Sequence, residues 1–133
     1  MSIAIVPLTP QQVFDNALTG IRAQDYISSR MSSGTCAYRG VDGAKCGIGH
    51  SIPDNLYESR MDDLDEGTTI DCVISQFPAM EQLFSACPLG FLEAVQEAHD
   101  SMYSSDNRNT RATRFEQSMK QTADLYQLAY VRP

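Results

Sequence analysis

Two cysteines and a histidine surround a glycine-rich stretch, and side chains of these types can bind a metal ion. Cys36, Cys46 and His50 lie within TCAYRGVDGAKCGIGHSIPDNLY, residues 35–57, in the order Cys-x9-Cys-x3-His. Structural zinc sites use about four ligands and usually pair cysteines two to four residues apart. The spacing here is wider, and a fourth ligand would have to come from Cys72 or His99. Zinc therefore ranks below a packed structural role for these residues.

The same side chains could also serve as a nucleophile and its base. A catalytic cysteine needs a neighbouring base and an activated thiolate, so Cys46 with His50 and Cys36 with His99 are the pairs to weigh. His99 stands at the end of an expected helix, where a histidine more often interacts with the last carbonyl groups. The chain contains no Gly-x-Ser-x-Gly or His-Glu-x-x-His motif. We expect no enzyme activity, no cofactor and no metal.

An anion site is the second interpretation of this stretch. Arg39 and Lys45 stand beside Gly40, Gly43 and Gly47, and a guanidinium together with turn amides suits phosphate geometry. Neither a Walker motif nor a dinucleotide fingerprint is present. The alternative is that Arg39 forms an ion pair with Asp42 or Asp54 near the surface.

The element expected to position these residues is a short β-hairpin. Residues 35–39 and 45–48 flank Val-Asp-Gly-Ala, and an Asp-Gly pair tolerates the positive φ angles of tight turns. In that register Tyr38 faces Cys46, and the two cysteines lie diagonally, which disfavours a disulfide. We expect a packed hairpin, with the disulfide as the last choice.

Helices are predicted for most of the remaining chain. Thr9 and Pro10 are typical of a helix start, and Phe14, Leu18 and Ile21 would share its buried face. Further apolar stripes predict helices over residues 69–76, 79–86, 88–102 and from about 112 to 126, with Pro78 and Pro88 at helix starts. The fold class is therefore predicted as α+β: a mostly helical single domain, residues 1–133, with one short β-hairpin packed among the helices.

The net charge of the chain restricts the class of molecule that it can bind. The chain has 17 acidic and 10 basic side chains, a net charge of −7, which repels nucleic-acid phosphates and anionic membranes and attracts a basic protein surface. The acidic connector formed by Asp62, Asp63, Asp65 and Glu66 would contribute to that attraction. We identify no signal peptide and no membrane span, so we expect a cytosolic protein with reduced cysteines.

A resemblance covers most of the chain. The pattern Cys-x-Tyr-Arg-Gly-x-Asp-Gly-x-Lys-Cys-x-Ile-Gly-x-x-Ile-Pro-Asp-x-x-Tyr, residues 36–57, is similar to the core of a group of small phage and prophage proteins without an assigned function. Their later helix is similar to LEAVQEAHD, residues 92–100, and a final helix opens on an aromatic residue, here Phe115. Val41 and Phe115 depart from the group, where proline and tryptophan are common. The matching positions are Tyr38, Arg39, Gly40, Asp42, Gly43, Lys45, Gly49, Pro53, Asp54, Tyr57, Gln96, His99 and Asp100.

The resemblance implies a small phage-type protein that binds and inhibits or modulates a host protein, such as nucleic-acid-processing or defence machinery, with charge mimicry as one route. The alternative is a protein that binds a nucleotide or another phosphate-bearing molecule through Arg39 and Lys45, and a zinc-dependent enzyme is the third choice. A cluster of Arg39, Asp54, His99 and Asp100 would join the hairpin to the later helix. The candidate binding residues are Tyr38, Arg39, Lys45, His50, Asp54, Asp62, Asp63, Asp65, Glu66, His99 and Asp100. The oligomeric state is left open.

Overall fold

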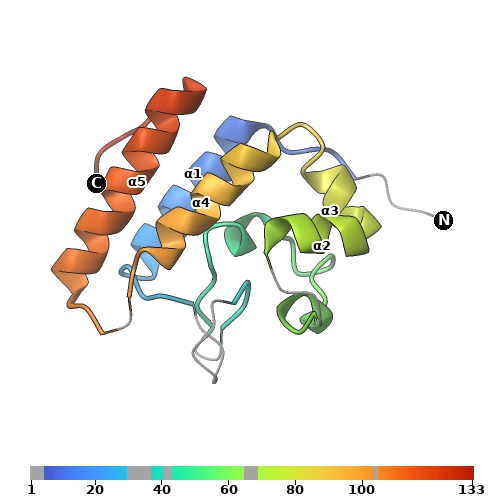
Figure 1. Ribbon diagram of the computed structural model, residues 1–133, viewed down its shortest axis with the longest axis horizontal. Helices are drawn as coiled ribbons and strands as arrows, with labels where there is room; N and C mark the ends of the chain where they lie inside the picture. The colour runs from blue at the N-terminus through green and yellow to red at the C-terminus, as the bar shows by residue number, and fades with distance from the viewer. Residues whose placement is uncertain (1–4, 30–36, 41–42, 65–68, 104) are drawn as a thin grey trace.

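Helices form the scaffold of the molecule. The structure is a computed structural model that describes residues 5–29, 37–40, 43–64, 69–103 and 105–133. In Figure 1 the three long helices run side by side, and the two short α-helices lie beside them. The elements are α1 (Pro10–Ala23), the 3₁₀ turns η1 (Gly49–Ser51) and η2 (Ser59–Asp62), α2 (Ile70–Gln76), α3 (Pro78–Leu83), α4 (Leu89–Asp100) and α5 (Arg108–Tyr126).

The start of α1 confirms the prediction made from Thr9 and Pro10. The Thr9 hydroxyl accepts a hydrogen bond from the Gln12 amide at 3.1 Å, and the Gln12 side chain accepts one from the Thr9 amide at 2.9 Å. This reciprocal pair satisfies amide groups that the first turn of a helix leaves without partners. The buried face of the helix carries Phe14, Leu18 and Ile21, as their spacing predicted.

The other predicted helices also exist, with small differences at their ends. α3 ends at Leu83 rather than at residue 86, and α4 begins at Leu89 with Pro88 as its N-cap residue. In α5, the Asn107 side chain caps the first turn by accepting from the Thr110 amide at 2.9 Å. The helices bury one core, to which α4 contributes Phe91, Leu92, Val95 and Ala98, and α5 contributes Phe115, Met119 and Ala123.

The predicted β-hairpin is wrong, and with it the α+β class. None of the described residues forms a β-strand. Residues 37–40 and 43–48 instead form turns and irregular backbone, and residues 35, 36, 41 and 42 lie outside the described part. Two backbone bonds connect these two stretches: the Gly40 amide donates to the Ala44 carbonyl at 2.8 Å, and the Gly43 amide donates to the Gly40 carbonyl at 3.3 Å.

Side chains from elsewhere occupy the backbone groups that a hairpin ladder would have used. The carboxylate of Asp62 accepts from the amides of Tyr38 and Arg39, and the side-chain amide of Gln24 bonds to both backbone groups of Lys45. Since each backbone amide donates only once, these bonds replace strand pairing. The segment still packs among the helices, because Tyr38, Cys46 and Ile48 are buried in the core.

None of the helices in the described ranges is long and apolar enough to cross a membrane.

Candidate functional site

Asp62 organises the irregular segment in which most candidate residues lie. One carboxylate oxygen accepts from the Tyr38 amide at 2.7 Å, and the other accepts from the Arg39 amide at 3.2 Å and from the Tyr57 hydroxyl. A carboxylate that accepts several such bonds from a chain segment fixes its path. Asp62 thus holds together two parts of the chain that are more than 20 residues apart in sequence.

Arg39 lies at the surface of this segment and forms the ion pair with Asp54 that was one of the two predicted from sequence. Its Nη2 atom is 2.6 Å from a carboxylate oxygen of Asp54 and donates to the Ile52 carbonyl at 3.3 Å. The guanidinium lies over the Tyr57 ring, 4.4 Å from its centroid. The Asp54 side chain is 87% exposed, whereas that of Arg39 is 25% exposed. The arginine is therefore fixed in place while its carboxylate partner stands in solvent.

His50 packs against α1 at the one position where that helix has a glycine. A Cβ atom on Gly20 would lie 2.3 Å from two atoms of the His50 ring, so the ring occupies space that any side chain would fill. The Nε2 atom of His50 is 3.0 Å from Oε1 of Gln24. Because Nε2 of Gln24 donates to the carbonyls of Ile27 and Lys45, its Oε1 is the acceptor. His50 therefore carries its proton on Nε2.

Burial, and then the nearby positive charge of Lys45, lower the pKa of His50 from 6.5 to about 4. Both act on the charged form of the ring, which loses hydration and is repelled by the ammonium group. The imidazole is therefore neutral at pH 7 and acts as a hydrogen-bond donor to Gln24.

We expect the low pKa of His50 to make stability depend on pH. In the unfolded chain the ring takes up a proton near pH 6.5, whereas in the folded chain it does so only near pH 4. The contribution of His50 to the free energy of unfolding is therefore complete above about pH 6.5 and is lost as the pH falls toward 4. After allowance for partial solvent exposure, the loss is about 2 kcal/mol. Urea unfolding at several pH values measures this loss. His50→Gln should remove that part of the slope, and an unchanged slope would contradict the assignment.

Lys45 and His50 line a hollow of about 430 Å³, which we call the Lys45 hollow. Its apolar wall comes from Leu8, Ile52, Pro53 and Leu83. Nδ2 of Asn16 donates to the Ser51 hydroxyl at 3.2 Å across its lining. Within the described ranges, no carboxylate lies within ion-pair distance of the Lys45 ammonium. The polar lining residues are Asn16, Lys45, His50, Ser51 and Asp54.

Cys46 packs in the core as a protonated thiol. Cys46 is fully buried, its sulfur accepts from the Gly49 amide at 3.2 Å, and burial raises the pKa of its thiol. A thiol in this environment stays protonated and is a poor nucleophile and metal ligand. No group of three histidine, cysteine, aspartate or glutamate side chains among the described residues could hold a metal ion. Cys36, the first member of the predicted zinc set, lies outside those residues.

His99 and Asp100 belong to a separate contact. His99 is fully buried, its Nε2 accepts from the Ser29 amide at 2.8 Å, and its Nδ1 is 3.0 Å from an Asp100 carboxylate oxygen. The bond from Ser29 shows that Nε2 carries no proton, so Nδ1 donates to Asp100. The bond between Ser29 and His99 attaches the chain after α1 to the end of α4. Neither residue lines the Lys45 hollow, and Arg39 and Asp54 pair with each other rather than with this histidine.

The described residues of the acidic connector do not share one environment. Asp62 faces inward, as described above, while Asp63 is exposed, and Asp65 and Glu66 lie outside the described residues. A basic protein partner therefore stays a prediction that rests on the net charge of −7 and on the exposed carboxylates, without the carboxylate of Asp62.

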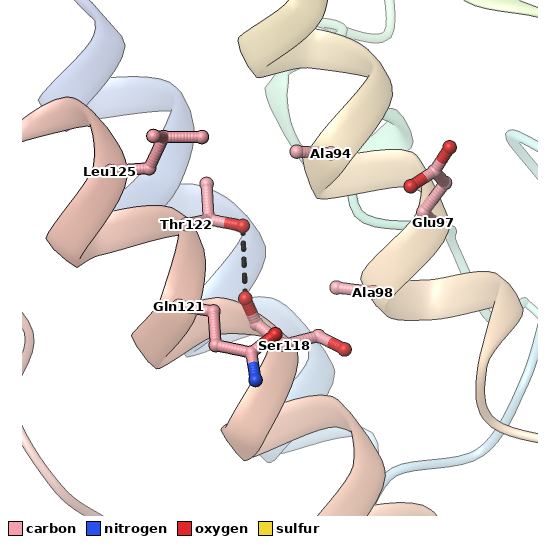
Figure 2. Close-up of a pocket in the computed structure, with 7 residues that line it drawn as sticks. All are labelled: Ala94, Glu97, Ala98, Ser118, Gln121, Thr122 and Leu125. Carbon is pink, nitrogen blue, oxygen red and sulfur yellow. Dashed lines mark hydrogen bonds between the residues drawn. The ribbon is translucent and has the colours of Figure 1, made fainter.

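Another hollow lies between α4 and α5 (Figure 2). It has a volume of about 210 Å³, and its walls are mostly small or uncharged side chains. The Thr122 hydroxyl, on the α5 side in Figure 2, already donates to the Ser118 carbonyl at 2.9 Å. Glu97 is its one charged lining residue, so this groove offers no set of groups for binding an anion.

Sequence reasoning missed the residues that connect the site to α1. Asn16, Gln24 and Ser51 were not candidates, although Gln24 fixes Lys45 and His50 together and Asn16 bonds to Ser51 across the hollow. Polar residues on a helix give no local sign of which distant backbone they contact. The glycine at position 20 was the one available signal, because an interior glycine can mark close approach of another group.

No protein-family model, no curated protein and no solved structure matches this chain. The resemblance to small phage proteins therefore has no support beyond the motif residues themselves. The β-hairpin predicted for the motif residues is wrong, because none of the described residues forms a β-strand.

Proposed function

We propose that the protein is a non-catalytic binding protein whose Lys45 hollow takes a small phosphate-bearing molecule. The observation that carries this proposal concerns two positively charged side chains: Lys45 has no carboxylate partner among the described residues, and the partner of Arg39 is an exposed carboxylate that a ligand could replace. Lys45 lines the hollow with no carboxylate within ion-pair distance in the described residues. Among the same residues Arg39 forms an ion pair only with the solvent-exposed Asp54, which lines the hollow although Arg39 does not.

Asp54 stands where an anionic oxygen of a ligand would bind. Its carboxylate is 2.6 Å from Nη2 of Arg39 although 87% of its side chain is exposed, and an exposed ion pair of this kind contributes little to stability. A phosphate group that displaces Asp54 would gain a charged bond from Arg39 in addition to the one from Lys45.

The rest of the hollow suits a compact organic group attached to that phosphate. Its volume of about 430 Å³ lies within the range of small-molecule sites, roughly 300–1,000 Å³. Leu8, Ile52 and Leu83 supply apolar surface, while Asn16 and Ser51 supply hydrogen-bonding groups. The absence of catalysis is proposed because the neighbouring thiol of Cys46 is buried and protonated and His50 is neutral and already bonded.

The test is titration with inorganic phosphate and with nucleoside 5′-monophosphates, followed by calorimetry and by NMR of the His50 ring. We expect Lys45→Met to weaken binding at least about tenfold, because a charge-assisted bond is lost. A bound phosphate should also raise the pKa of His50, since it offsets the charge of Lys45. Lys120→Met is the matched control, because it removes the only other lysine and lies outside the hollow.

Asp54→Asn provides a second, opposite change. Removing the carboxylate that competes for Arg39 should strengthen phosphate binding several-fold, whereas a purely structural ion pair would leave binding unchanged. If none of these probes binds, or if Lys45→Met and Lys120→Met behave alike, the proposed ligand class is wrong.

A further inference from the structure

The last residues of the chain form a strap that returns over the helices. Residues 127–133, called the strap below, leave α5 at Gln127 and run back beside that helix (Figure 1). Gln127 has a φ angle of 57°, in the left-handed region, and the Leu128 amide donates to the Ala123 carbonyl at 2.8 Å. This geometry reverses the chain direction in one residue. Because Gln127 has a side chain, its left-handed conformation is unfavourable.

Two side chains of α1 hold the strap by its backbone. The side-chain amide of Gln11 donates to the Ala129 carbonyl at 3.1 Å and accepts from the Ala129 amide at 2.9 Å. Nη2 of Arg22, about three turns further along the helix, donates to the Val131 carbonyl at 2.6 Å. Bonds of this kind recognise an extended backbone, whichever chain it belongs to.

One side chain of the strap is recognised specifically. The Tyr130 hydroxyl donates to a Glu116 carboxylate oxygen at 2.6 Å, and the Arg22 guanidinium lies 5.7 Å from the Tyr130 ring centroid. Glu116 also accepts from Arg22 at 2.7 and 2.9 Å and from the Tyr26 hydroxyl at 2.9 Å. The acceptor is therefore positioned by α1 and its following turn. Gln11, Arg22 and Glu116 form what we call the strap seat.

The strap covers its seat loosely. A hollow of about 700 Å³, lined by Gln117, Lys120 and Arg132 among others, lies between it and α5. Val131 on the strap and Leu125 just before the hinge are 72% and 73% exposed. Leu128 and Tyr130 are the strap side chains that pack, half-buried, against the core. Polar bonds and these two partial contacts therefore retain the strap, and an element with few fully buried apolar contacts opens at lower cost than a core helix.

We propose that the strap exchanges between two copies of this chain, so that residues 127–133 of each copy occupy the strap seat of the other. Every contact made within one chain is available unchanged between two chains, which is the condition for domain swapping. Opening allows α5 to continue through Gln127, which removes the unfavourable left-handed conformation. This inference does not depend on the ligand proposed for the Lys45 hollow.

The hinge residue gives the first test. Gln127→Gly makes the left-handed turn favourable and should stabilise the closed monomer, whereas Gln127→Ala retains its cost and should favour exchange. Light scattering after size exclusion, over a range of concentrations, should show dimer dissociation constants that differ at least about fivefold between the two variants. Equal dimer fractions in both variants, or monomer alone in all samples up to millimolar concentration, would overturn the proposal.

A cross-link separates exchange from ordinary surface association. In a full-length chain that carries both Gln11→Cys and Ala129→Cys, oxidation joins positions 11 and 129 wherever the strap occupies a seat. Peptide mapping should find this link within one chain at low concentration and increasingly between two chains as the concentration rises. The link within one chain confirms that the variant is folded. If that link persists alone while dimers are present, the dimer does not exchange its strap and the proposal is wrong.

Discussion

Asp62→Ala is expected to lower the free energy of unfolding by about 3–5 kcal/mol, because one carboxylate satisfies three donors in the irregular segment. Two of these are the backbone amides of Tyr38 and Arg39, and the third is the Tyr57 hydroxyl. A hydrogen bond to a charged group contributes about 1.5–3 kcal/mol, and a buried amide left without an acceptor costs about 1–3 kcal/mol. Urea unfolding at pH 7, followed by circular dichroism, measures the change.

Asp63→Ala is the matched control for this prediction. Asp63 is the next residue and is exposed, so its removal should change stability by no more than about 0.5 kcal/mol. The loss of stability caused by Asp62→Asn should lie between those of the two alanine changes. The asparagine oxygen can still accept a hydrogen bond, but its NH₂ group would face a backbone amide or hydroxyl that also donates. Similar effects of the two alanine changes would show that Asp62 is an ordinary member of an acidic surface.

The helices could be predicted from sequence because their signals are local. The Thr9 cap and Pro10 lie next to the helix they start, and the apolar stripe of Phe14, Leu18 and Ile21 repeats within three turns. The same holds for the stripes that became α4 and α5. Such patterns decide which face is buried without knowledge of the partner.

The β-hairpin was predicted from equally local signals and failed because the decisive contacts are distant. Alternating residues and an Asp-Gly pair favour a hairpin, but Asp62 and Gln24 come from more than 20 residues away to take its backbone groups. Asp62 was predicted to belong to an acidic connector, and Gln24 was not among the candidate residues. Nothing in the run Asp62, Asp63 identifies which of the two faces inward.

The candidate site was predicted in part. The ion pair between Arg39 and Asp54 is one of the two that were expected. Lys45 and His50, each named as a candidate, line one hollow that the sequence did not predict. His99 and Asp100 pair with each other instead. Charged and titratable residues can be chosen as candidates from the sequence, because their side chains carry the chemistry. Asn16 and Gln24, which join the site to α1, give no such sign. The proposed ligand site thus depends on contacts between α1 and the turn at Gly49–Ser51 that only the folded chain shows.

Gly49→Ala is expected to be the most damaging glycine substitution in the described segment, at about 3 kcal/mol or more. A Cβ atom at this position would lie 2.3 Å from the Tyr38 carbonyl oxygen and 3.1 Å from its carbon. Both atoms belong to the backbone that Asp62 holds in place, so neither can move without breaking further bonds. Overpacking a rigid site costs about 1–3 kcal/mol, and more when the backbone must shift. Thermal and urea unfolding measure the loss.

Gly20→Ala supplies the control, because its clash is as short but involves a side chain. The Cβ atom would lie 2.3 Å from the His50 ring, so removing that ring should remove the clash. In a His50→Ala background we expect Gly20→Ala to stabilise the protein by up to about 1 kcal/mol, which is the helix preference of alanine over glycine. A double-mutant cycle should therefore show a change of sign at Gly20. Gly49→Ala should remain destabilising in the same background, because backbone atoms obstruct its Cβ. If both substitutions were rescued alike, the close approach of Gly49 to Tyr38 would not be what fixes the segment.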